Sequence, residues 1–180
     1  TQEATASEQI GRRTIGLQIR LWIGYLTTCT ASLMVLGHVA NILMHAGGTR
    51  QDATRVVFLV GATTAAGGLA AGWLNDRVGR RVLMIALPIF SAITLVSMTQ
   101  VTGQFMILAL GMTGAVYGAT ITVFPSSISR IFGLHDGVIV YGRIMTAWGL
   151  AGLGGPALAG MTYDTVSYKH SRAHETVPDH

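Results

Sequence analysis

One short segment of the chain combines an acid with several bases and two glycines. It runs Gly72-Trp73-Leu74-Asn75-Asp76-Arg77-Val78-Gly79-Arg80-Arg81. Asp76 supplies a carboxylate suited to a helix N-terminus or to an arginine on a neighbouring helix. Gly72 lets another helix approach closely, and Gly79 permits a tight backbone turn. Arg77, Arg80 and Arg81 suit an anionic membrane face.

A basic turn with helix breakers is also typical of a loop that only sets membrane topology. An acid embedded among the arginines argues against that reading, because topology alone requires no aspartate. Arg130 ends a later apolar stretch and is the natural partner of Asp76. We therefore predict that Asp76 contacts Arg130 across two helix ends.

A second set of polar side chains interrupts otherwise apolar stretches. Ionisable or hydrogen-bonding groups at membrane depth are functional candidates, although helix-to-helix packing is the alternative for each. Asn41 lies nearly one turn beyond His38, on roughly the same face. The predicted substrate-binding residues are Trp148, Thr146, His38, Asn41 and Tyr117. We predict no catalytic residue, cofactor or metal site, and interpret His170 and His174, four apart in a polar tail, as not metal-binding.

These residues lie in five apolar stretches that indicate membrane helices. Half of the chain is hydrophobic and 11% is charged, against about 25% in soluble domains. A membrane helix needs about 20 apolar residues, and the predicted spans are residues 21–44, 56–74, 82–99, 105–128 and 138–163. Gly68 and Gly72, and Gly114 and Gly118, have the spacing of close helix packing. The predicted fold is all-α, a polytopic membrane helical bundle of five transmembrane helices.

Charge predicts how this bundle is oriented in the membrane. Short connections make consecutive helices antiparallel, and basic residues favour the cytoplasm. Eight of the twelve Lys and Arg residues share one predicted side: Arg12, Arg13, Arg20, Arg77, Arg80, Arg81, Arg130 and Arg143. We predict a cytoplasmic linker (1–17), a five-helix half-domain (18–163) and a polar external tail (164–180). The net charge of +4 follows from these loops, and no basic stripe with aromatics indicates nucleic-acid binding.

The segment 72–81 resembles the loop motif of the major facilitator superfamily, which follows the second helix of each six-helix half. The resemblance implies that the chain is most of a C-terminal half, helices seven to eleven of twelve, in the inner or plasma membrane. Its implied partners are membrane lipid, a small organic anion and the missing N-terminal half. The implied function is secondary transport by alternating access, in which the loop acid engages neighbouring helix ends and stabilises one conformation. The gating residues that the resemblance implies are Gly72, Asp76, Arg77, Gly79, Arg80, Arg81 and Arg130.

The stretches 141–156 and 124–127 further resemble the oxalate/formate antiporter family. They include Tyr141-Gly142 and Thr146-Ala147-Trp148-Gly149, and end with Gly155-Pro156. Oxalate-exchanging members, as aligned, carry an arginine and a lysine where this chain has Gly68 and Trp148. The resemblance therefore implies a monocarboxylate-like substrate and excludes oxalate, because a dianion at the midplane needs paired positive charge.

Two other classes of protein remain as alternatives. A membrane-embedded enzyme needs converging acids, histidines or a nucleophile, and only His38 qualifies in the spans, so we predict that the chain is not an enzyme. A truncated, non-transporting membrane fragment or subunit is the other alternative, because five spans leave a six-helix half incomplete.

Overall fold

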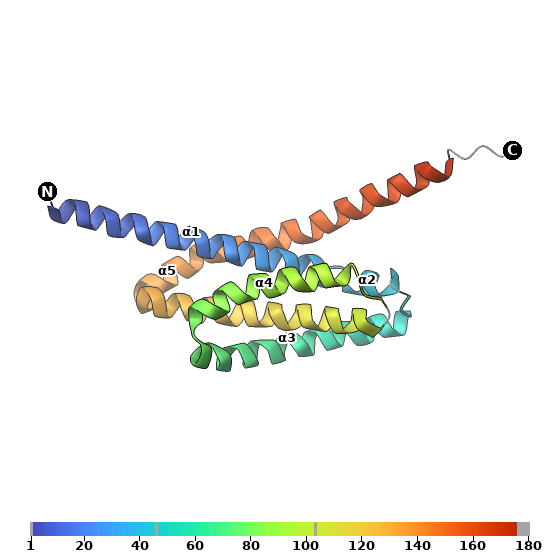
Figure 1. Ribbon diagram of the computed structural model, residues 1–180, viewed down its shortest axis with the longest axis horizontal. Helices are drawn as coiled ribbons and strands as arrows, with labels where there is room; N and C mark the ends of the chain where they lie inside the picture. The colour runs from blue at the N-terminus through green and yellow to red at the C-terminus, as the bar shows by residue number, and fades with distance from the viewer. Residues whose placement is uncertain (1, 46, 103, 176–180) are drawn as a thin grey trace.

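The computed structural model describes the backbone of residues 2–45, 47–102 and 104–175, and side chains between residues 14 and 161 except at 46, 103, 134 and 135. The described part is helical and contains no strand, which confirms the all-α prediction. The helices are α1 (Gln2–Leu36), α2 (Val39–His45), α3 (Arg50–Val78), α4 (Arg80–Met98) and α5 (Gln104–Glu175), as Figure 1 shows.

Five helical segments are long and apolar enough to cross a membrane, which confirms the predicted number. They are Thr14–Leu36, Arg50–Val78, Arg80–Met98, Gln104–Gly133 and Asp136–Met161. Large apolar side chains cover their outer surface: Phe58, Leu69 and Leu153 are each about four-fifths exposed. Lipid tolerates such a surface, and helices satisfy their backbone hydrogen bonds internally as lipid requires.

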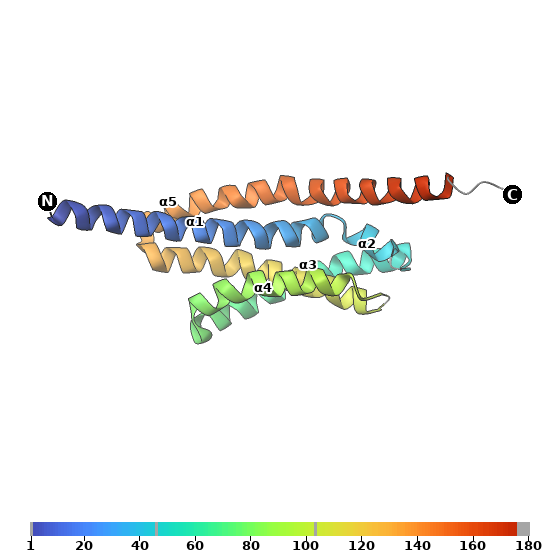
Figure 2. The same cartoon turned by 45° about the horizontal axis from the view of Figure 1, so that its top comes forward.

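Both turns on the basic side of the bundle consist of a single non-helical glycine. Gly79 has φ 96° between α3 and α4, and Gly133 has φ 79° within α5. Side chains other than glycine rarely adopt this backbone region. Gly133 therefore divides α5 into a first arm (104–132) and a second arm (134–175), which folds back over the bundle in Figure 2.

The predicted loops 75–81 and 129–137 are consequently too long. Asn75, Asp76 and Arg77 occupy the last turn of α3, and Arg80 and Arg81 the first turn of α4. Helix geometry therefore fixes the direction of these side chains. A flexible loop would leave them free to reorient.

The predicted single span 21–44 is wrong at its end. α1 stops at Leu36, and a separate short helix, α2, follows after Gly37 and His38. A Cβ atom at Gly37 would lie 3.3 Å from Cγ of Pro156, so the second arm of α5 presses on the chain where α1 ends. The helix break thus coincides with a contact that only residues distant in the sequence create.

The ends of the chain extend these helices. α1 begins at Gln2 and α5 continues to Glu175, so the backbone of the polar segments 2–17 and 164–175 is helical. We predicted an aperiodic tail, and its helical backbone differs from that expectation. The side chains of residues 1–13 and 162–180, including His170 and His174, lie outside the described part. The assignment of these segments as linker and external tail stays a prediction.

The first arm of α5 is the central helix. Of its apolar 18-residue window, 61% is buried, against 17–28% of the corresponding windows in the other four spans. It contributes to three apolar clusters, with α1 and the second arm, with α1, α2 and α3, and with α3 and α4. α1 packs against both arms through Tyr25 and Cys29, which meet Phe124 and Ile144 in one cluster.

Glycines bring α3 and the first arm into backbone contact. A Cβ at Gly118 would collide with the carbonyl oxygen of Thr64, and a Cβ at Gly67 with the backbone of Ala115. At Gly114 it would lie 2.7 Å from the carbonyl oxygen of Val60. The predicted packing role of Gly114 and Gly118 is confirmed. On α3 the closest approach is at Gly67, and Gly68 and Gly72 make looser contacts with Thr122.

We predict that Gly118→Ala destabilises the protein by about 1–3 kcal/mol, because backbone atoms must separate to admit the methyl group. Thermal unfolding of the purified protein in detergent measures this. Gly61→Ala on α3 is the matched control, since nothing lies within 4 Å of a Cβ there. Equal stability of the two variants would show that the crossing is looser than described.

Candidate functional site

The predicted partners Asp76 and Arg130 meet at the basic end of the bundle. Nη2 of Arg130 donates a hydrogen bond of 3.1 Å to Oδ1 of Asp76, which joins the end of α3 to the end of the first arm of α5. Both side chains are more than half exposed. An exposed pair of this kind contributes about 0–1 kcal/mol, so it can break and re-form with little change in the stability of the fold.

A buried hydrogen bond lies beside this ion pair. Nδ2 of Asn75 donates to Oγ of Ser126 at 3.2 Å, and Asn75 is only 6% exposed. Sequence reasoning missed this contact, although both residues belong to segments that it singled out. The signal was available in the position of Asn75, which precedes Asp76 and therefore points from α3 at a different angle, about 100° away.

The remaining gating residues surround these two contacts. The guanidinium carbon of Arg77 lies 4.2 Å from the ring centroid of Trp73, a cation–π contact on the exposed face of α3. Gly79 forms the turn, Arg80 is half-buried at the start of α4, and Arg81 is exposed. Gly72 lies 3.7 Å, measured from an added Cβ, from Cγ2 of Thr122. Their role in transport stays a prediction.

Three of the predicted substrate-binding residues take part in two separate hydrogen bonds that join the second arm of α5 to its neighbours. Thr146 faces α1 and Trp148 faces the first arm, and we call the four hydrogen-bonded residues together the polar wall. Nε1 of Trp148 donates a 2.9 Å hydrogen bond to Oη of Tyr117 on the first arm. Nε1 of Trp22 on α1 donates a 3.0 Å hydrogen bond to Oγ1 of Thr146. Trp148 is 40% exposed, so the wall is open on one side. Trp22 is a member that sequence reasoning missed.

The hydrogen bonds of the Thr146 and Tyr117 hydroxyl groups give these two groups different roles. Oγ1 of Thr146 accepts from Trp22 and donates to the carbonyl oxygen of Arg143 at 2.7 Å, so its proton is used. Oη of Tyr117 accepts from Trp148, and the described residues show no acceptor for its proton. A phenolic hydroxyl both donates and accepts. Tyr117 is therefore the hydroxyl on this wall with a proton available for a ligand.

His38 and Asn41 are placed elsewhere. His38 lies in the link after α1, beyond the span Thr14–Leu36, and so not deep within a span as expected. Its Nδ1 atom is buried and has no hydrogen-bond partner among the described residues. Asn41 is exposed on α2. The described part of the chain shows no hydrogen bond from either residue to the polar wall, and their binding role stays a prediction.

Arg143 is the charged residue nearest in sequence to this wall. Its Nη1 atom donates a 3.4 Å hydrogen bond to Oε1 of Gln18 on α1, and its side chain is exposed. Within the described residues, no group of three or more His, Cys, Asp or Glu side chains is arranged to hold a metal ion. The two hydrogen bonds of the wall join neutral groups, and Arg143 lies one turn before Thr146 on the second arm.

The structure combines five membrane spans with a glycine turn at Gly79 and an ion pair beside that turn. Residues 21–171 match the family described as the Major Facilitator Superfamily. The chain belongs to the major facilitator superfamily. A relative described as "Uncharacterized MFS-type transporter YhjX", from Escherichia coli (strain K12), is 30% identical over 141 residues. The match covers 74% of this chain and 34% of the relative, so the chain spans about a third of that protein's length.

Membership of the major facilitator superfamily gives the Asp76–Arg130 contact a testable meaning. We predict that Asp76→Asn lowers the transport rate by up to about fivefold while membrane insertion stays normal, because the helix ends lose an ion pair of about 0–1 kcal/mol and one conformation is no longer held. Uptake into cells, normalised to the amount of protein in the membrane, measures this.

The reciprocal exchange provides the control. Asp76→Arg combined with Arg130→Asp restores the opposite charges across the same 3.1 Å contact, and should recover part of the lost rate. Wild-type transport by Asp76→Asn would remove the gating role of the pair. No recovery in the exchanged variant would show that Asp76 acts through another partner.

Proposed function

We propose that this chain is the C-terminal half of a secondary transporter that exchanges a small organic anion, monocarboxylate-like in charge, by alternating access. The observation that carries the proposal is the neutral polar wall of Trp148 and Tyr117. It offers a free phenolic proton and an indole edge but no cationic group. One negative charge can be held by such donors, whereas two charges at membrane depth need paired cations.

The open side of the wall supports the assignment to one half of a larger protein. Trp148 is 40% exposed in this chain, and one wall cannot enclose a substrate. In transporters of this kind a midplane site lies between two repeats that rock around it. An N-terminal half would provide the facing wall, and the greater length of the matched relative is consistent with this arrangement.

The substrate class rests on two positions where the oxalate exchangers, as aligned, carry cations. Gly68 is packed towards Thr122, with 3.0 Å between an added Cβ and Oγ1 of Thr122, so a longer side chain there must displace α5 or turn away. Trp148 occupies the other position and directs its N–H to Tyr117. We infer a singly charged substrate on this basis, together with the resemblance to the oxalate/formate antiporters.

Orientation and location are part of the same proposal. With the Gly79 and Gly133 turns facing the cytoplasm, most arginines lie on the side that the positive-inside rule favours. The N-terminus is then cytoplasmic and the protein lies in the inner or plasma membrane. Transport of the organic anion is coupled either to protons or to a second anion.

We predict that proteoliposomes containing the protein expressed at the full length of its gene take up at least one short monocarboxylate. Uptake should be saturable and accelerated by unlabelled anion on the opposite side, as exchange requires. Oxalate should neither be transported nor compete. Tight competition by oxalate would refute the exclusion of dianions, and uptake of neutral solutes alone would refute the substrate class.

We further predict that Tyr117→Phe raises KM for that substrate about tenfold, because a hydrogen bond to a charged group contributes about 1.5–3 kcal/mol. Tyr25→Phe is the matched control: Tyr25 is 1% exposed, and its hydroxyl lies 3.9 Å from Sδ of Met145. Steady-state uptake kinetics of both variants measure the difference. An unchanged KM in Tyr117→Phe would exclude this hydroxyl from the binding site.

A further inference from the structure

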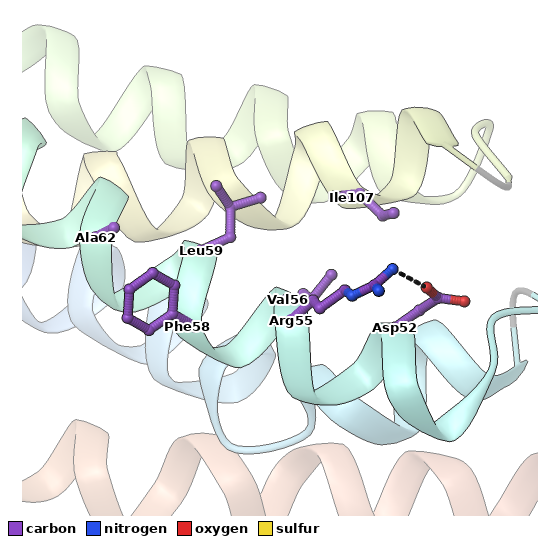
Figure 3. Close-up of a pocket in the computed structure, with 7 residues that line it drawn as sticks. All are labelled: Asp52, Arg55, Val56, Phe58, Leu59, Ala62 and Ile107. Carbon is purple, nitrogen blue, oxygen red and sulfur yellow. Dashed lines mark ion pairs between the residues drawn. The ribbon is translucent and has the colours of Figure 1, made fainter.

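A groove lies between the beginning of α3 and the beginning of α5, at the opposite end of the bundle from the Gly79 turn. Its volume is about 400 Å³. Figure 3 shows Asp52 and Arg55 at one end of it and Phe58, Leu59 and Ala62 along α3 towards the other, with Ile107 contributed by α5. The gating contacts and the polar wall involve none of these residues.

The polarity of the groove changes in one direction. Arg55 and Asp52 lie in the first two turns of α3, where that helix meets water, and Ala62 lies about 10 Å further along the helix axis. Phe58 is 80% exposed, which places a bare aromatic surface between them. The groove is therefore charged at the membrane boundary and apolar towards the membrane interior. A phospholipid has the same order, with a charged head group followed by apolar acyl chains.

The charged end of the groove presents one acid and one base side by side. Nη1 of Arg55 lies 3.7 Å from Oδ1 of Asp52, and the two side chains are 70% and 37% exposed. Oδ2 of Asp52 is held by the hydroxyl and backbone N–H of Thr49 at 2.6 and 3.1 Å. The carboxylate is thus fixed, while the guanidinium is weakly paired and free to bind elsewhere.

We propose that this groove binds a phospholipid with a zwitterionic head group, one phosphate and one ammonium. Arg55 holds the phosphate, Asp52 receives the ammonium, and an acyl chain lies over Phe58, Leu59 and Ala62. A net anionic head group fits less well, because the fixed carboxylate of Asp52 repels it. Binding requires that the groove faces lipid in the membrane, and it is independent of the proposed substrate.

The test uses the protein expressed at the full length of its gene, reconstituted in vesicles of equal phosphatidylethanolamine, phosphatidylglycerol and phosphatidylcholine. After extraction in mild detergent, mass spectrometry counts the lipids retained on the protein. The wild type should retain phosphatidylethanolamine in clear excess over phosphatidylglycerol. Ala62→Phe should lower that retention about tenfold by displacing the acyl chain. Ala70→Phe, an exposed position of α3 outside the groove, should leave it unchanged.

The head-group contacts give a sharper result. Arg55→Gln should reduce retention of both phosphatidylethanolamine and phosphatidylglycerol, because both carry the phosphate. Asp52→Asn should shift the preference from phosphatidylethanolamine towards phosphatidylglycerol, because it removes the ammonium partner and the repulsion together. An unchanged preference in Asp52→Asn would overturn the head-group assignment.

Crosslinking in the membrane keeps the proposal falsifiable if a filled groove prevents folding. A photoreactive benzoylphenylalanine at position 58 should attach to phospholipid. Attachment to polypeptide, either another part of the same protein or a second copy, would show that protein covers the groove and would overturn the proposal. So would equal lipid retention by the wild type and Ala62→Phe.

Discussion

The rest of the structure depends on the backbone contact between α3 and the first arm of α5. In lipid the hydrophobic effect does not drive helices together, so association depends on close packing and hydrogen bonds. Gly114 and Gly118 remove the side chains that would hold the helices apart, and Val60 and Thr64 fill the space. Hydroxyl groups of Thr63 and Thr64 turn back to the carbonyl oxygen of Val60, so they leave no unpaired polar group at the crossing.

The crossing of α3 and the first arm of α5 determines which residues meet at the Gly79 end of these helices. Towards the Gly79 turn, α3 and α5 converge on Asn75 and Ser126, and beyond these on the exposed Asp76–Arg130 pair. The buried hydrogen bond holds the helices together whether or not the outer ion pair is formed. The predicted gating role of the pair requires a rigid contact of this kind beside it, because an ion pair on two independently moving helices could not report on the position of either.

Composition and spacing were sufficient to predict the fold class and the five spans, and together with the resemblance of the loop motif they predicted the Asp76–Arg130 contact. These predictions depend on local properties of the sequence: the length of the apolar stretches, the glycines that break helices, and one acid among arginines. The break after Leu36 was missed; it lies where Pro156 of the second arm approaches Gly37, which is a tertiary contact. Trp22 was missed because it lies among apolar residues that explain its stretch of sequence, and only its partner Thr146 on the second arm shows its role. Asn75 was missed although its position, about 100° from Asp76 around α3, could be read from the sequence.

The same tertiary placement decides which polar residues of the wall can act on a ligand. From sequence, Thr146 and Tyr117 are equivalent hydroxyl donors in adjacent spans. In the structure, Trp22 and the carbonyl oxygen of Arg143 use both functions of Thr146, so this residue positions the second arm against α1. Trp148 uses only the acceptor function of Tyr117 and orients its ring. The proton left to Tyr117 is the donor that the proposed singly charged substrate would use, because a hydrogen bond to an ionised acceptor is stronger than one between neutral groups.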